Sequence, residues 1–99
     1  MLTIADMFPE APTEVHFSLT CPAASVENTE SYAAFHSCAI SASLLGFRVS
    51  VDDFNPDGSA SMVATGMTTM GEALDFGALL SVRAETHGFA FSPIMVASI

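Results

Sequence analysis

The residues of this chain that could carry out chemistry are few and widely spaced. The 99 residues contain three histidines, two cysteines and only two Lys or Arg residues. His36 and Cys38 lie two positions apart in an expected helix, where side chains at that spacing do not face each other. Spacing alone leaves open a pairing of Cys21 with His16 or His87, and no Gly-x-Ser-x-Gly segment is present. We therefore expect no catalytic residues, no cofactor and no enzymatic activity. The alternative is a small enzyme that uses a face of the sheet, but no sequence motif supports it.

The two basic side chains are both arginines, Arg48 and Arg83. Each falls on the outward-facing phase of an expected strand, so together they predict an anion-binding or partner-binding face on the sheet. The alternative is cross-strand pairing with carboxylates, which contributes less than about 1 kcal/mol for each exposed pair. The carboxylates available for such pairing are Glu14, Asp52 and Glu85.

The segment Asp53–Gly58 resembles the first half of a calcium-binding EF-hand loop. The twelfth position of such a loop supplies a bidentate glutamate, but Ala64 stands there, and Pro56 interrupts the loop. Asn-Pro-Asp-Gly is also typical of a tight turn, because proline presets φ and glycine tolerates the left-handed conformation. We expect a hairpin turn at Asn55–Gly58 and no metal.

Composition indicates one folded domain that covers residues 1–99. Hydrophobic residues make up 51% of the chain, and the net charge is −9 because bases are scarce, with 11 acidic residues. Nucleic acid and anionic membranes are excluded as partners, since both require clustered Lys or Arg. The longest uncharged run, Ser31–Phe47, is shorter than the about 20 residues of a membrane span. Cys21 and Cys38 fit neither a zinc site nor a disulfide framework, so we expect buried thiols and a cytoplasmic protein.

The first half of the chain has clear secondary-structure signals. Residues 1–12 form an irregular lead-in with two prolines, and Thr13–Thr20 alternates apolar and polar residues as a half-buried strand does. A helix begins between Ser25 and Ser31 and ends at Gly46. Its predicted core stripe consists of Phe35, Cys38, Ala39, Ala42 and Leu45. The strand Phe47–Asp53 then leads into the turn.

The second half is read as three shorter elements and a tail. Ser59–Ala64 forms a weakly patterned strand, and a short helix containing Met67, Met70 and Leu74 ends at Gly77, with Thr69 and Glu72 as a capping box. The alternation of Ala78–Glu85 predicts the last strand.

The tail, residues 88–99, is apolar and uncharged. Ser92-Pro93 is typical of a helix start, so a helix of one or two turns is expected there. Such a terminus must bury itself on its own domain or on a partner. The tail therefore predicts a partner-binding segment made of Phe89, Phe91, Ile94, Met95, Val96 and Ile99.

The predicted order is β-α-β-β-α-β plus a tail. Alternating strands imply a sheet with one solvated face, so both helices should cover the other face. This predicts an α+β open-faced β-sandwich, with the ferredoxin-like sandwich as the alternative that shares the element order.

Several segments resemble HPr, the small phosphocarrier protein of the sugar phosphotransferase system. Tyr32–Phe35 resembles the start of the first helix of that family, Phe47–Val51 its second strand, Gly66–Gly71 its short helix and Gly77–Glu85 the strand that follows. The resemblance covers about three quarters of the chain and implies an HPr-like fold and a role in phosphotransfer.

The phosphoacceptor segment of the HPr family has no counterpart in this chain. The family places a histidine, an arginine and a proline before the first helix, where Glu27–Ser31 stands here. The expected function is therefore a non-catalytic binding or assembly module on an HPr-like scaffold, acting on a protein partner or as a homo-oligomer. A divergent phosphocarrier or regulator of the phosphotransferase system is the alternative.

Overall fold

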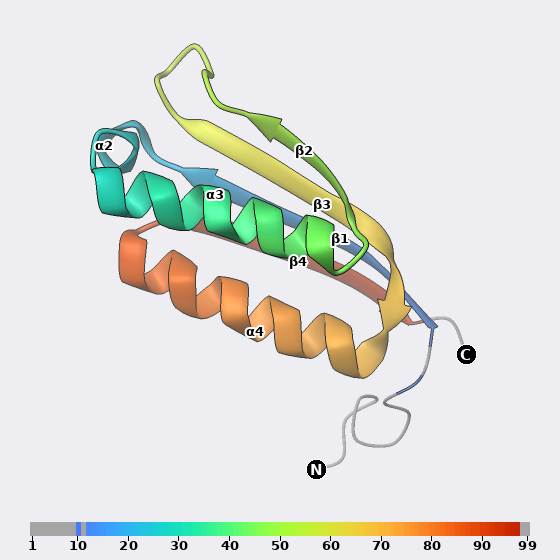
Figure 1. The fold of residues 1–99 in the computed structure, drawn as a ribbon. Helices are drawn as coiled ribbons and strands as arrows, with labels where there is room; N and C mark the ends of the chain where they lie inside the picture. The colour runs from blue at the N-terminus through green and yellow to red at the C-terminus, as the bar shows by residue number, and fades with distance from the viewer. Residues whose placement is uncertain (1–9, 11, 98–99) are drawn as a thin grey trace.

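The fold is an α+β arrangement of one sheet and its covering helices, seen in a computed structural model that describes residue 10 and residues 12–97 (Figure 1). The expected lead-in 1–12 lies almost wholly outside the described residues, and so does Ile99. The elements are β1 (Pro12–Cys21), α2 (Ala23–Val26), α3 (Thr29–Leu44), β2 (Arg48–Asp52), β3 (Ala60–Thr69), α4 (Met70–His87) and β4 (Ala90–Ala97).

The four strands form one antiparallel sheet in the order β2-β3-β1-β4. Each long helix connects two parallel strands that have an antiparallel strand between them. Helix α3 joins β1 to β2 across β3, and α4 joins β3 to β4 across β1. Both connections are thus split β-α-β units. The register aligns His16 of β1 with Thr65 of β3 and Ile94 of β4.

Both long helices cover the same face of the sheet, as the alternation of the strands predicts (Figure 1). Val15, Phe17, Leu19 and Cys21 of β1 point toward the helices and are completely buried. The intervening residues of β1 face the other side and are exposed or half-buried. The prediction of an open-faced sheet is confirmed.

Local capping signals explain the ends of α3. The Asn28 side chain accepts a hydrogen bond from the Ser31 N–H (3.0 Å), which satisfies one of the free donors of the first turn. At the other end Gly46 adopts a φ of 94°, and the N–H groups of Gly46 and Phe47 bond back to the carbonyls of Ser43 and Ala42. This pattern is a Schellman motif, so the predicted helix end at Gly46 is confirmed.

The turn between β2 and β3 is also confirmed. The Gly58 N–H donates to the Asn55 carbonyl (2.9 Å), and Gly58 has a φ of 87°. The Asp57 carboxylate accepts from both the hydroxyl and the N–H of Ser59, and these bonds hold the pKa of Asp57 below its ordinary value. The loop is therefore closed by its own side chains.

The second half of the chain differs from the prediction. Ala78–Glu85 is not a strand but part of α4, and β3 runs on through the expected start of the short helix to Thr69. Leu80 and Ala84 are buried in a helix as they would be in a strand, because a spacing of four residues fits both periods. Val82 decides between them: it is exposed on α4, whereas a strand would bury it. One half of the expected capping box is confirmed, because the Glu72 N–H donates to Thr69 Oγ1 (3.1 Å), whereas the Glu72 carboxylate accepts from Thr68 Oγ1.

The predicted helix in the tail is wrong. Residues 90–97 form β4, which pairs with β1 at an edge of the sheet. Ser92-Pro93 was interpreted as a helix start, but proline is tolerated on an edge strand, where only one side of the backbone must bond to a neighbour.

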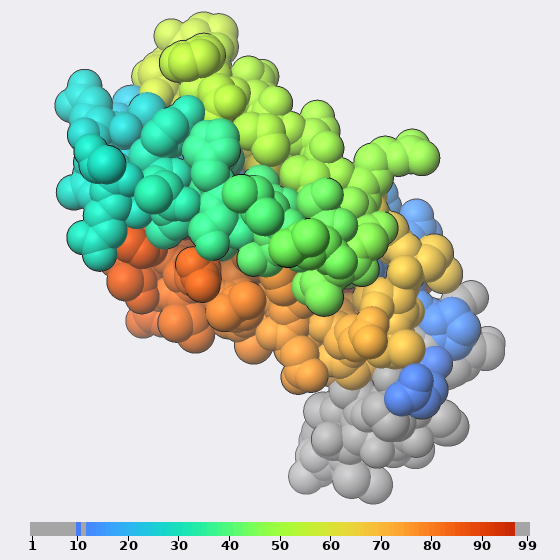
Figure 2. Space-filling model, in the orientation of Figure 1, coloured from blue at the N-terminus to red at the C-terminus, as the bar shows by residue number. Residues whose placement is uncertain are grey.

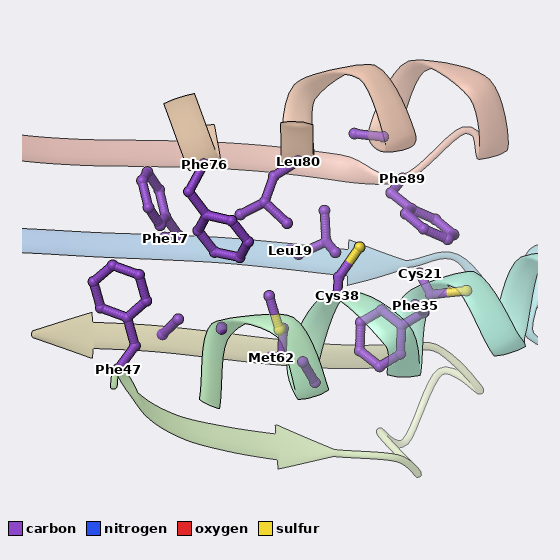
Figure 3. Packing of buried hydrophobic residues seen from close by; sticks show 14 of the residues in the cluster. Phe17, Leu19, Cys21, Phe35, Cys38, Phe47, Met62, Phe76, Leu80 and Phe89 are labelled. Atoms are coloured by element: carbon purple, nitrogen blue, oxygen red, sulfur yellow. The ribbon is translucent and has the colours of Figure 1, made fainter. Parts of the chain in front are cut away.

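The core lies between the sheet and the two long helices (Figure 3). It contains stacked and edge-on aromatic rings together with both cysteines. The largest side chains in it are Phe17, Leu19, Phe35, Phe47, Met62, Phe76, Leu80 and Phe89.

Candidate functional site

A cavity of about 290 Å³ opens between the C-terminal end of α3 and the N-terminal half of α4. Both helices face the viewer in Figure 2, α3 in teal to green and α4 in orange. The lining is mostly apolar and comes from the loop after α3, from β3 and from α4. It consists of Leu45, Phe47, Thr68, Glu72, Asp75, Phe76 and Leu79.

Two phenylalanines form the apolar part of this groove. Phe47 follows the Schellman motif of α3 and stacks on Phe76 of α4, with ring centroids 5.8 Å apart. Phe47 lies directly over Gly66 of β3, where an added Cβ would come within 2.9 Å of its ring. The absence of a side chain at Gly66 thus allows the ring to reach its position. Leu45 was predicted to be buried; it is exposed and lines the groove instead.

The groove carries acidic residues and no basic ones among its lining residues. Glu72 and Asp75 lie three positions apart on α4, which places them on the same side of the helix. Thr68 Oγ1 donates to Glu72 Oε2 (2.5 Å) and holds that carboxylate in place. The groove therefore combines an apolar interior with fixed negative charge.

The open face of the sheet exposes apolar side chains as well. Val63 and Met67 of β3 and Ile94 and Val96 of β4 point away from the helices and are exposed. They flank a polar row on β1, in which His16 Nε2 lies 3.2 Å from Glu14 Oε1. This face is a mixed apolar and polar surface without a covering element among the described residues.

The structure does not bring the two predicted anion-binding arginines together. Arg48 lies on β2 and faces the open side of the sheet, opposite Thr65. Arg83 lies on α4, which covers the other face of the sheet, close enough to Cys38 to influence its pKa. Neither arginine forms a salt bridge with a described residue, so the alternative of cross-strand pairing is not observed either.

The six predicted tail residues divide between the two faces of the sheet. Phe89 is buried in the core, and Phe91 and Met95 pack against it, half-buried. Ile94 and Val96 point to the open face, and Ile99 lies outside the described residues. Only part of the tail is therefore available to a partner.

The side chains of Tyr32, His36 and Asp53 form a polar cluster that sequence reasoning missed. Tyr32 donates to Asp53 Oδ1 (2.9 Å), and His36 Nε2 lies 2.8 Å from the same oxygen. The hydrogen bond to Asp53 raises the pKa of the Tyr32 hydroxyl. The Cys21 thiol lies close enough to influence Tyr32, but it is completely buried. The structural role of the cluster is to connect α3 to the loop after β2. The i, i+4 spacing of Tyr32 and His36 was the only signal for it in the sequence.

His87 connects the end of α4 to the start of α3. Its Nδ1 lies 3.1 Å from the Ser31 hydroxyl, its carbonyl accepts from Ser25 Oγ (3.2 Å), and its ring stacks on Phe89. Ser31 is largely buried, and its hydroxyl is engaged by His87. The contact between Ser31 and His87 is therefore a packing contact between two helix ends.

The remaining chemical residues are also accounted for by the fold. Cys21 and Cys38 are free and buried, and burial raises the pKa of both thiols, which keeps them protonated and unreactive. The described residues contain no cluster of three or more His, Cys, Asp or Glu side chains that could hold a metal ion. Among them, no helix is both long and apolar enough to cross a membrane.

Comparison with protein-family models gives no match, and comparison with curated proteins gives no significant match. Function has to be inferred from the two apolar surfaces themselves, the groove on the helix side and the open face of the sheet.

Proposed function

We propose that this protein is a non-catalytic binding and assembly module that associates with a second copy of itself through the open face of its sheet. The observation that carries the proposal is the exposure of Val63, Met67, Ile94 and Val96 on that face. Exposed apolar patches bordered by polar residues are typical of interaction sites. The chemistry-bearing residues described above, in contrast, have structural roles.

The open face is large enough for a specific interface. Strands about 4.8 Å apart and about eight residues long, at about 3.4 Å per residue, give roughly 500 Å² in projection for four strands. A standard interface buries about 800 Å² per partner, and weak or transient interfaces bury less. Two such faces together give roughly 1,000 Å², which is at the low end of specific interfaces. The open face therefore supports a dimer of weak affinity.

The charges on the open face favour a second copy as the occupant. Arg48 has no ionic partner among the described residues, and Glu14 and Asp52 lie exposed on the same face. In a two-fold symmetric dimer each contact occurs twice, so an arginine of one copy that meets a carboxylate of the other gives two ion pairs. A strongly acidic chain without this arginine would only repel its own copy.

Replacing Ile94 with glutamate is expected to disrupt self-association. We expect the unmodified protein to be dimeric at tens of micromolar and Ile94→Glu to raise the dissociation constant at least about tenfold. Burial of one such side chain contributes about 1.5–3 kcal/mol, and one tenfold step corresponds to about 1.4 kcal/mol. Sedimentation equilibrium or light scattering over a concentration series measures the effect.

Ile40→Glu is the matched control, because Ile40 has nearly the same exposure, 61% against 58% for Ile94, but lies on α3. This control is expected to leave the dimer intact. A monomeric unmodified protein at these concentrations, or an equal effect of both substitutions, would contradict the proposal.

We infer further that the scaffold is ferredoxin-like rather than HPr-like. The strand order β2-β3-β1-β4 and the length of α4, 18 residues, support this class. The local matches to HPr at Gly66–Gly71 and Gly77–Glu85 fall on different element types here, which weakens the resemblance. The free thiols support the proposal of a reducing, cytoplasmic location.

A divergent phosphocarrier is the second candidate, and the position of His87 is the observation that favours it. Its ring lies beside Ser31 in the first turn of α3, and a helix N-terminus is where backbone N–H groups hold a phosphate. Glu30 in the same turn, however, would repel that phosphate.

We expect no phosphate transfer to this protein. Incubation with phosphoenolpyruvate and Enzyme I of the phosphotransferase system, followed by intact mass spectrometry, should leave the mass unchanged. The HPr of the same system serves as the positive control. An acid-labile gain of one phosphate that disappears in His87→Ala would establish the phosphocarrier function instead.

A further inference from the structure

We propose that the groove between α3 and α4 binds a short basic and apolar segment of another protein. This site lies on the helix side of the molecule and is independent of the self-association proposed for the open face of the sheet.

The size of the groove favours a few side chains over a whole metabolite. Its volume of about 290 Å³ is at the lower limit of sites for small organic ligands, which start at about 300 Å³. The apolar lining also reaches the surface, because Leu45 and Leu79 are exposed. A peptide can place one or two large apolar side chains in the cavity and cover these two leucines.

The charge of the groove selects a basic occupant. Glu72 and Asp75 are the charged residues of the lining, and the Thr68 hydroxyl fixes the Glu72 carboxylate at its border. Asp75 has no hydrogen-bond or ionic partner among the described residues, so its carboxylate is free to accept one. The net charge of −9 attracts cationic partners to the chain as a whole. The apolar interior of the groove requires that the bound peptide also carry apolar side chains next to its basic ones.

The probe is a fluorescein-labelled amphipathic peptide made of leucine and lysine, and the readout is fluorescence anisotropy at low salt. Two peptides of the same length serve as ligand controls. One has glutamate in place of lysine, and the other has serine in place of leucine. Only the leucine–lysine peptide is expected to bind.

Two double variants of the protein distinguish binding in the groove from general attraction to an acidic surface. Glu72→Gln/Asp75→Asn is expected to weaken binding roughly five- to tenfold, since each exposed ion pair contributes little on its own. Glu27→Gln/Glu85→Gln also removes two charges, at exposed positions outside the groove, and is expected to change the affinity less than about twofold.

The apolar part of the site is tested in the same way. Leu79→Ser is expected to weaken binding about tenfold. Leu74→Ser is the matched control, because Leu74 is 38% exposed against 42% for Leu79 and lies on α4 outside the groove. Circular dichroism verifies that each variant is folded.

Three results would overturn the proposal: equal losses for both charge variants, unchanged binding by Leu79→Ser, or loss of binding in Ile94→Glu. The last would place the peptide on the open sheet face. Retained binding by Ile94→Glu, together with the losses at Glu72, Asp75 and Leu79, establishes the groove whether or not the protein self-associates.

Discussion

Replacing Phe17 with alanine is expected to lower the free energy of unfolding by about 3–5 kcal/mol, the range typical of phenylalanine-to-alanine changes in a core. Phe17 lies on β1 at the centre of the sheet and is completely buried. Its ring centroid lies 5.8 Å from that of Phe76, 5.9 Å from that of Phe91 and 6.2 Å from that of Phe47. Removing it leaves a cavity lined by rings from α4, β4 and the loop before β2, which cannot all move in to fill it.

The measurement is urea unfolding followed by circular dichroism. Phe54→Ala is the matched control, because Phe54 is 87% exposed in the loop after β2 and its removal should change the stability by less than about 0.5 kcal/mol. A domain of this size usually has about 5–15 kcal/mol of net stability, so Phe17→Ala should be marginally folded. Similar losses for both substitutions would mean that β1 is not the centre of the core.

Replacing Gly66 with valine is expected to destabilise the protein by about 1–3 kcal/mol through overpacking. Gly66 faces the helices, and a Cβ there would lie 2.9 Å from Cδ1 of Phe47, closer than packed atoms approach. The ring would have to move, and with it the stack on Phe76 that forms the interior of the groove. The same change should therefore weaken binding of the leucine–lysine peptide.

Unfolding in urea and peptide binding are measured on the same preparation. Thr65→Val is the control, because Thr65 precedes Gly66 on β3 but points to the open face of the sheet. It keeps the β-branched shape and replaces a hydroxyl with a methyl group on the face opposite Phe47, so it should leave both stability and peptide binding nearly unchanged. A Gly66→Val protein that is as stable as the unmodified one would show that Phe47 can move at no cost.

The two surfaces differ in how far the sequence could have revealed them. The exposed apolar residues of β4 were predicted as part of an uncharged tail, although as a helix and together with the buried Phe89 and the half-buried Phe91. The groove was not anticipated, because its two halves, Leu45 with Phe47 and Thr68 with the start of α4, are more than twenty residues apart in the chain. Leu45 in particular fits the core stripe of α3 by spacing, yet it is the C-cap of that helix and lines the groove as an exposed residue.

Elements with local signals could be predicted from the sequence. The alternation in β1, the helix end at Gly46 and the turn at Asn55–Gly58 depend on residues within a few positions of one another. The start of α3 was predicted only to between Ser25 and Ser31, and the structure selects Asn28 as its cap. Backbone preferences and nearby hydrogen bonds are sufficient to specify such features. The coarse fold class, with one open face on the sheet, follows from the same alternation.

The second half of the chain depends on contacts between elements that are distant in sequence. Leu80 and Ala84 satisfy a helix and a strand equally, and the choice depends on whether Phe76 and Ala73 can be buried with them against β1. That burial requires a packing surface that is distant in sequence. The presence of Pro93 in a strand likewise depends on the position of β4 at the edge of the sheet. The position of Arg83 changed with its element, from the sheet to a helix on the opposite side from Arg48. Local sequence patterns could not predict the position of Arg83, because the face on which a side chain lies depends on what its element packs against.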